Sequence, residues 1–153
     1  MGKINRKIFD EEYDEIYAEA QRVADDFWTY HSTQNAKMKK TGGEASYISP
    51  MVRRTTDYTI KIFWVKCFFT KKPCGGFQRR TTHIKKKKGN IYNMAVLLKA
   101  APAWEHDSIR MAENEFAFLR ARLHHLTRIG NHLRLYEEVM ASKKVQAPEP
   151  AEF

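Results

Sequence analysis

Two long segments of this chain carry apolar residues at alternating spacings of three and four, which constrains the fold more than any other feature. In the first segment these residues are Phe9, Tyr13, Ile16, Ala20, Val23, Phe27 and Tyr30. In the second they are Ile109, Ala112, Phe116, Leu119, Leu123 and Leu126, and Ile129, Leu133, Tyr136 and Met140 extend the pattern after a small shift. This spacing places an apolar stripe along one side of an α-helix. We therefore expect two long amphipathic helices, one near each end of the chain.

Local signals set the expected limits of the first helix. Asp10 is the expected N-cap, because its side chain can accept a hydrogen bond from the first turn. Gly42-Gly43 marks the latest end of the helix. A loop is expected from Thr41 to Pro50.

The second half of the chain has its own boundaries. Ala100-Ala101-Pro102 breaks the chain before the second long helix, and a short helix is expected over Met94–Lys99. The last residues, 145–153, are polar and contain proline, so we expect a disordered tail there. Residues 1–144 are expected to form one domain.

The middle of the chain is rich in β-branched and aromatic residues. The run Tyr58–Thr70 (YTIKIFWVKCFFT) predicts a strand. Both of its faces are apolar, which favours a central position in a sheet. After a turn at Lys71–Gly76, residues Phe77–Lys86 are expected to return as a second strand at an exposed edge, because this run has only two apolar residues. A short third strand is expected near Ile91-Tyr92.

These elements predict an α+β fold, in which two long antiparallel helices pack on a central antiparallel β-hairpin or three-stranded sheet. The second apolar face of the sheet then needs a cover, which a homodimer would provide. The chain has no run of 18 apolar residues, so we expect no transmembrane helix and no membrane partner. The N-terminus lacks the apolar run of a signal peptide, and a cytoplasmic location is expected.

The positive charge of the chain is concentrated in its middle third. Residues 37–88 contain 15 basic residues and only two acidic ones, Glu44 and Asp57. Residues 1–36 carry a net charge of −4, and residues 89–153 carry none. A segment this cationic indicates a polyanionic partner, such as nucleic acid.

The candidate binding site consists of basic residues on and around the two expected strands. They are Arg53, Arg54, Lys71, Lys72, Arg79, Arg80, His83, Lys85, Lys86, Lys87 and Lys88. Alternation along the second strand predicts Arg79 and Lys85 on one face and Arg80 and Lys86 on the other. A basic two-stranded ribbon fits the major groove of duplex DNA, and its phosphate contacts would make binding depend on salt. The alternative is a solvated edge, because edge lysines discourage aggregation.

Aromatic residues in and around the two expected strands allow a second kind of contact. They are Tyr58, Phe63, Trp64, Phe68, Phe69 and Phe77. Such rings can stack on single-stranded nucleic acid. Core packing is the expected role for most of them, because large aromatic side chains dominate protein cores. Phe69 and Phe77, near the turn, are the expected exceptions.

Signatures of catalysis and metal binding are missing from the sequence. His124 and His125 are adjacent and have no ligand partner four residues away, and no C-x-x-C or H-E-x-x-H motif occurs. We therefore expect no metal and no cofactor. The helix carboxylates Glu113 and Glu115 are expected to be exposed and solubilising. We expect no enzyme, and a small nuclease is the remaining catalytic alternative.

Three groups of residues carry a resemblance to a known family. They are Ile84, Lys88, Gly89 and Tyr92 in the run IKKKKGNIY, the pair Trp104-Glu105, and Glu113, Phe116, Ala117 and Arg120 in an E-x-x-F-A-x-x-R pattern. From residue 10 to residue 140 the order of parts resembles the MobI-type conjugative transfer proteins of integrating conjugative elements and large conjugative plasmids.

The resemblance implies an auxiliary mobilisation factor of the relaxosome, which acts with a separate relaxase at the origin of transfer. We therefore expect a non-catalytic DNA-binding accessory factor in the bacterial cytoplasm. Its expected partners are DNA and a relaxase or other conjugation proteins. Two alternatives stay open: a protein–protein adaptor of a conjugation or secretion apparatus, and an RNA- or ribosome-associated binding protein.

Overall fold

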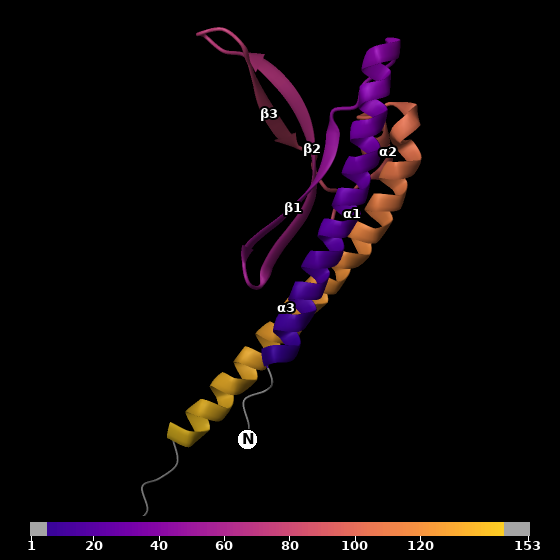
Figure 1. Cartoon of the computed structure of the whole chain (residues 1–153). Coiled ribbons are helices and arrows are strands. Elements are labelled where there is room, and N and C mark those ends of the chain that lie inside the picture. Colours follow the sequence, from indigo (N-terminus) through magenta and orange to yellow (C-terminus); the bar gives the residue numbers. More distant parts are fainter. Residues whose placement is uncertain (1–5, 146–153) are drawn as a thin grey trace, which may run out of the picture.

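The computed structural model describes residues 6–145 and consists of two long helices beside one sheet (Figure 1). Its elements are α1 (Arg6–Thr41), β1 (Ile48–Thr56), β2 (Thr59–Lys71), β3 (Phe77–His83), α2 (Met94–Lys99), the 3-10 helix η1 (Ala103–Glu105) and α3 (His106–Val145). The predicted mixed α+β class, with a three-stranded antiparallel sheet between terminal helices, is confirmed. Of the predicted tail, only Val145 is described, and it ends α3. Among the described residues, no helix has the length and hydrophobicity needed to cross a membrane.

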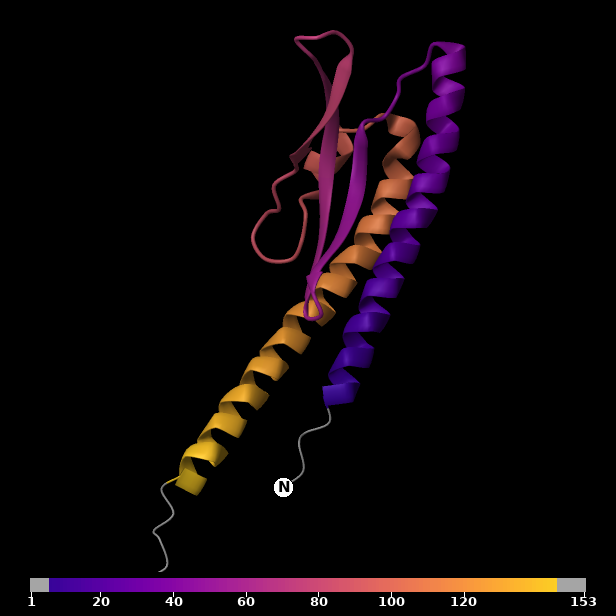
Figure 2. The same cartoon turned by 60° about the vertical axis from the view of Figure 1, so that its left-hand side comes forward.

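The helices α1 and α3 lie side by side and run in opposite directions (Figures 1 and 2). The residues that α1 buries are Tyr13, Ile16, Ala20, Val23, Ala24, Phe27 and His31. They follow the predicted stripe as far as Phe27, after which His31 is buried and Tyr30 is exposed. A stripe with a 3.5-residue repeat drifts around a helix that has 3.6 residues per turn, so the buried side shifts along a long helix.

The two ends of α1 differ in how well they were predicted. Helix α1 already includes Arg6, so Asp10 lies one turn inside it and is not the N-cap. Instead, the Asp10 carboxylate accepts a hydrogen bond from the Tyr58 hydroxyl at 2.6 Å, which raises the pKa of Tyr58. The predicted end is confirmed, because α1 stops at Thr41 and Gly42 adopts a φ of 74°, a conformation that favours glycine.

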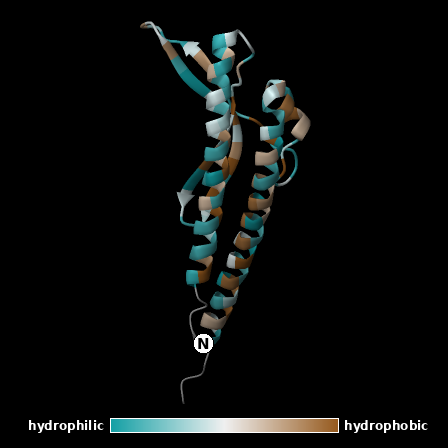
Figure 3. Ribbon diagram, turned by 45° about the vertical axis from the view of Figure 1, so that its right-hand side comes forward, coloured by the Kyte–Doolittle hydropathy of each residue, from teal (hydrophilic) through white to brown (hydrophobic). Residues whose placement is uncertain are grey.

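Helix α3 is buried in its first half and exposed in its second. The buried residues of its stripe are Ile109, Ala112, Phe116, Leu119 and Leu123. Figure 2 shows that α3 continues beyond the start of α1. In the second half of α3, Ile129, Leu135 and Val139 are exposed. In Figure 3 the hydrophobic colours gather along α3 and the middle of the sheet.

The sheet has the strand order β1-β2-β3 with antiparallel neighbours, so β2 is central as predicted. The third strand is β1, which precedes the predicted hairpin, and the expected strand near Ile91-Tyr92 is wrong. Strand β1 tolerates Pro50 because it is an edge strand. Strand β3 ends at His83, so Lys85 and Lys86 lie in the following coil and not on opposite faces of a strand.

One face of β2 packs on the helices. Trp64 is fully buried, and its ring centroid lies 5.2 Å from that of Phe27 and 6.0 Å from that of Phe116. On the opposite face Phe63 is also buried, and His83 stacks on its ring with centroids 4.5 Å apart. The single chain thus covers the middle of this second face, and the homodimer stays a prediction.

A buried polar network covers the part of the β2 edge that β3 leaves open. Arg120 donates from Nε to Ile62 O at 2.8 Å, and the Tyr92 hydroxyl accepts from Trp64 N at 3.1 Å. Glu113 accepts from Trp64 Nε1 at 2.7 Å and pairs with both terminal nitrogens of Arg120 at 2.8 and 2.9 Å. The side chain of Glu113 is only 3% exposed, so its predicted exposure is wrong. Burial also raises the pKa of Tyr92. Three residues that carry the family resemblance thus join the sheet to α3.

A second buried polar cluster joins the end of α1 to the 3-10 helix η1 and to the loop that follows α1. His31 Nδ1 lies 3.0 and 3.1 Å from the two carboxylate oxygens of Glu105. One turn further along α1, the Asn35 amide bonds to the backbone N and O of Ser46 at 2.8 and 2.9 Å. These contacts fix the position from which the chain enters β1.

Candidate nucleic-acid interface

The β2–β3 hairpin projects away from the helices as a free arm (Figures 1 and 2). We define the arm as residues 68–80, which comprise the end of β2, the turn and the start of β3. Every residue of β3 is exposed. In the turn Gly75 and Gly76 have φ values of 92° and 83°, and Lys72 N donates to Gly76 O at 2.9 Å. The glycines allow the tight turn that carries Lys72 at the tip.

The structure places the predicted site residues on three neighbouring segments. Lys71, Lys72, Arg79 and Arg80 lie on the arm; His83, Lys85, Lys86, Lys87 and Lys88 lie at the end of β3 and in the coil that follows; Arg53 and Arg54 lie on β1. All of them are exposed except Arg54, which is half-buried. The arm and the coil together present eight lysine and arginine side chains to solvent.

The cations of the arm and the coil have no carboxylate within ion-pair distance among residues 6–145. Arg79 donates to Cys67 Sγ at 3.0 Å, and Arg80 donates to Gln78 Oε1 at 3.4 Å, but neither acceptor is a carboxylate. By contrast, Arg22 in α1 forms ion pairs with three carboxylates. The positive charge of the arm is therefore not neutralised by the part of the chain that is described.

The two arginines on β1 have different environments. Arg54 donates to Asp14 Oδ1 and to Asp57 O, both at 2.7 Å. It therefore connects β1 to α1. Arg53 is exposed, and its guanidinium lies 5.7 Å from the centroid of the Phe63 ring. Of this pair, Arg53 is the one that can reach a ligand.

A cleft at the base of the arm brings in cationic residues that the sequence did not single out. It has a volume of about 640 Å³ and lies between β2, the coil after β3 and α3. Its cationic and histidine side chains are Lys61, Lys86, Arg120, Arg128, His83 and His124, and no carboxylate from residues 6–145 lines it. Lys61 and Arg128 come from distant parts of the chain, so the fold alone brings them together. No local sequence pattern could have identified this cleft.

Like charges are close together in this cleft. Partial burial lowers the pKa of Lys86, and the nearby cations Arg120 and Lys61 also lower it, whereas Glu113 acts in the opposite direction. An anion bound in the cleft would relieve this repulsion. The cleft thus extends the cationic surface from the arm towards α3.

The aromatic residues of the hairpin divide into a buried and an exposed group. Phe63 and Trp64 are buried, but Phe68, Phe69 and Phe77 are 42%, 56% and 72% exposed. The predicted exposure of Phe69 and Phe77 is confirmed, whereas the predicted burial of Phe68 is wrong. Exposed rings and unpaired cations therefore occur together on the arm.

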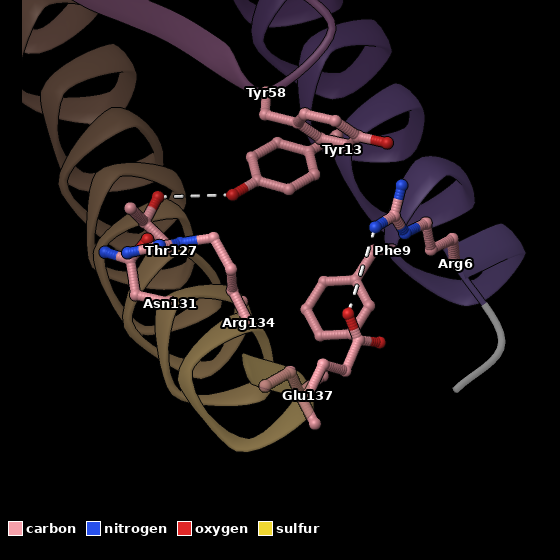
Figure 4. Close-up of a pocket in the computed structure, with 10 residues that line it drawn as sticks. Arg6, Phe9, Tyr13, Tyr58, Thr127, Asn131, Arg134 and Glu137 are labelled. Carbon is pink, nitrogen blue, oxygen red and sulfur yellow. Dashed lines mark hydrogen bonds and ion pairs between the residues drawn. The ribbon is translucent and has the colours of Figure 1, made fainter. Parts of the chain in front are cut away.

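A second cavity, of about 320 Å³, lies between the start of α1 and the second half of α3 (Figure 4). Tyr13 Oη and Thr127 Oγ1 are 3.2 Å apart there, and the Tyr58 ring meets the Tyr13 ring edge-on. Arg6 and Glu137 form an ion pair across it at 3.9 Å. None of the candidate site residues lines this cavity. It is not part of the candidate interface.

Within residues 6–145, no three side chains of His, Cys, Asp or Glu lie close enough together to hold a metal ion. Cys67 and Cys74 are both free thiols, the first buried and the second exposed at the tip of the arm.

Comparison with known proteins supports the resemblance seen in the sequence. The family model described as MobI protein matches residues 16–134, which is more than half of the chain. The matched segment contains the whole sheet, the coil after β3 and the buried network of Glu113 and Arg120. No curated protein and no solved structure matches the chain.

Proposed function

The chain belongs to the MobI family of mobilisation proteins, and we propose that it is a non-catalytic DNA-binding accessory factor for the start of conjugative DNA transfer. In this proposal it acts with a separate relaxase at the origin of transfer, in the bacterial cytoplasm. The arm and the coil after β3 hold the DNA. The helices α1 and α3 support the sheet and provide the surface on which the relaxase docks.

The observation that carries the proposal is the contrast in charge pairing between the arm and the helices. Several cations in the helices, such as Arg22 and Arg122, lie against carboxylates, whereas no cation of the arm or the coil has a carboxylate within ion-pair distance among the described residues. An edge that only avoids aggregation needs lysines on the strand itself. Here Lys85–Lys88 lie beyond the end of β3, and the cleft continues the positive surface further. This extent supports a polyanion site more than a protective edge.

The shape of the arm supports duplex DNA as one ligand. A two-stranded ribbon fits the major groove, and phosphate contacts on either side would position it there. Arg79 and Arg80 follow each other on β3 and so point to opposite faces of the ribbon. One of them can read a base edge while the other and Lys85–Lys88 contact phosphates.

The salt dependence of DNA binding tests the proposal. We expect the protein to bind an origin-of-transfer fragment with an affinity that falls about 10³-fold or more between about 50 and 200 mM salt, as for a protein with about six to eight phosphate contacts. Fluorescence anisotropy at several salt concentrations measures this slope. A fragment of unrelated sequence is the control for specificity.

The alternatives predict different results in the same experiments. An adaptor would bind no DNA in a gel shift, and its capture of a relaxase would survive nuclease treatment. An RNA-binding protein would co-purify with RNA and prefer it to the origin fragment. Either pattern would contradict the proposed DNA-binding role.

A further inference from the structure

Aromatic rings and cations alternate in two directions on one face of the arm. The antiparallel register places Phe69 directly opposite Arg79, and Lys71 directly opposite Phe77. Along each strand the residues two positions apart share a face, so Phe69 precedes Lys71 on β2 and Phe77 precedes Arg79 on β3. We call these four residues the checkerboard. Each ring therefore has a cation across the ladder and another along its own strand.

Two contacts further from the turn of the hairpin show that the four residues of the checkerboard share a face. Arg79 donates to Cys67 Sγ at 3.0 Å, which requires both side chains to lie on the same side of the sheet. His83, four residues after Arg79, stacks on Phe63 with ring centroids 4.5 Å apart. Phe69 continues the face of Phe63 and Cys67, and Phe77 continues that of Arg79 and His83.

Packing within the described chain does not account for the two rings of the checkerboard. Phe69 is 56% exposed and Phe77 is 72% exposed, whereas Phe63 on the same face is buried. The arm diverges from the helices to one side (Figures 1 and 2), and none of the described elements buries the rings at this end of the sheet. An exposed ring that the core does not use is available to a ligand.

The charge of this face identifies the chemistry of that ligand. Lys71 and Arg79 have no carboxylate partner among residues 6–145, and no acidic residue occurs in the arm. A protein partner that covers two phenylalanines would leave these cations unpaired unless it carried acidic groups at the same spacing. A nucleic acid strand supplies both requirements, because its phosphates alternate with flat bases that stack on aromatic side chains.

We propose that unpaired bases of a DNA strand stack on Phe69 and Phe77 while Lys71 and Arg79 contact the phosphates beside them, so that the arm prefers single-stranded or locally melted DNA to closed duplex. Diagonal neighbours in an antiparallel pair are about 7–8 Å apart, so each ring takes a separate base. The two rings cannot stack on bases that are already stacked inside a duplex. This inference rests on the proposed DNA-binding function and adds the strand state that the arm recognises.

Binding to a labelled oligo-dT strand and to a blunt duplex of the same length tests the inference. The wild-type protein is expected to bind the single strand more tightly than the duplex at equal salt. The double variant Phe69→Ala/Phe77→Ala is expected to lose about 25-fold or more in affinity for the single strand, from about 5-fold per base lost, and much less for the duplex. Replacing both residues with tyrosine keeps the rings and should keep the preference.

Phe118 provides the matched control. It lies on α3 and is 65% exposed, so Phe118→Ala removes a ring of the same kind and similar exposure from another surface. This variant should bind both DNAs as the wild type does. Because Phe69 and Phe77 are exposed, circular dichroism should show an unchanged fold in the double variant.

The outcomes separate this inference from the function on which it rests. Equal binding of duplex and single strand, with no effect of the double substitution, would overturn the stacking role and leave DNA binding intact. A loss of relaxase binding without a loss of DNA binding would assign the rings to a protein contact and also overturn it. Failure of the wild-type protein to bind any DNA would overturn the proposed function itself, and the inference with it.

Discussion

Replacing Glu113 with alanine is expected to lower the free energy of unfolding by about 3–5 kcal/mol, because the Arg120 guanidinium then stays buried without its counter-charge. The same change removes the acceptor of Trp64 Nε1 at 2.7 Å and of Tyr92 N at 3.4 Å. A domain is stabilised by only about 5–15 kcal/mol, so this is a large fraction of the total. Urea denaturation followed by circular dichroism measures the loss.

Glu115 provides the control for this substitution. It lies two residues further along α3 and pairs with Arg22 at 3.1 Å, but its side chain is 49% exposed. An exposed pair contributes at most about 1 kcal/mol, so Glu115→Ala should have a small effect. Equal losses for the two substitutions would show that the buried network does not hold the sheet to α3.

Removing both charges is not expected to restore stability. In a Glu113→Leu/Arg120→Leu variant, Ile62 O and Asn90 O lose their donors. Each buried polar group left without a partner costs about 1–3 kcal/mol. The network therefore joins separate backbone segments by hydrogen bonds. Leucine side chains have no donor for the carbonyl oxygens of those segments.

The helices and the central strand could be predicted because their signals are local. Helix α2 has the predicted bounds, and the Asn93 side chain caps it. Strand β2 lies within one residue of the predicted run. A stripe at helical spacing predicts a helix, and a run of β-branched and aromatic residues predicts a strand, without information from distant segments.

Strand β1 could not be predicted in the same way. Its sequence, ISPMVRRTT, contains Pro50 and a polar end, which together indicate a loop. Pro50 is compatible with the sheet only because β1 is an edge strand that pairs with β2 on one side. That compatibility depends on the pairing of β1 with β2, which the residues of β1 alone do not predict.

The burial of Glu113 and Arg120 could have been predicted from the sequence. Glu113 comes four residues after Ile109 and three before Phe116, and Arg120 comes four after Phe116. Both therefore lie on the apolar side of α3, where an unpaired charge is costly. The spacing did not reveal their partners in the sheet, because Ile62 and Tyr92 are distant in sequence.

The candidate interface was likewise only partly predictable. The exposed position of Lys71, Lys72, Arg79 and Arg80 follows from a polar edge strand and its turn. The cleft does not, because its walls come from β2, the coil and α3. The sequence shows where the charged residues lie along the chain, but the packing of distant segments determines which of them share a surface.

Replacing Lys85, Lys86, Lys87 and Lys88 with alanine is expected to weaken binding of the origin-of-transfer fragment by about 10³-fold near 100 mM salt. Each phosphate contact adds about 0.9 to the slope of log affinity against log salt, so the loss of four contacts should flatten the slope by about 3–4 units. All four lysines are exposed and lie in the coil after β3, so the fold should not change. Anisotropy titrations at several salt concentrations measure both quantities.

A variant that removes the same number of charges from the helices separates contact from general attraction. The exposed residues for this control are Lys99, Arg110, Arg134 and Lys143. Their replacement with alanine lowers the net charge equally, but it should leave the salt slope close to that of the wild type, because long-range attraction is screened beyond about 10 Å. Equal slopes for the two variants would mean that the protein attracts DNA only through its total charge. A flattened slope for Lys85–Lys88 alone would assign phosphate contacts to the coil, and the same variant should then lower DNA transfer from donor cells.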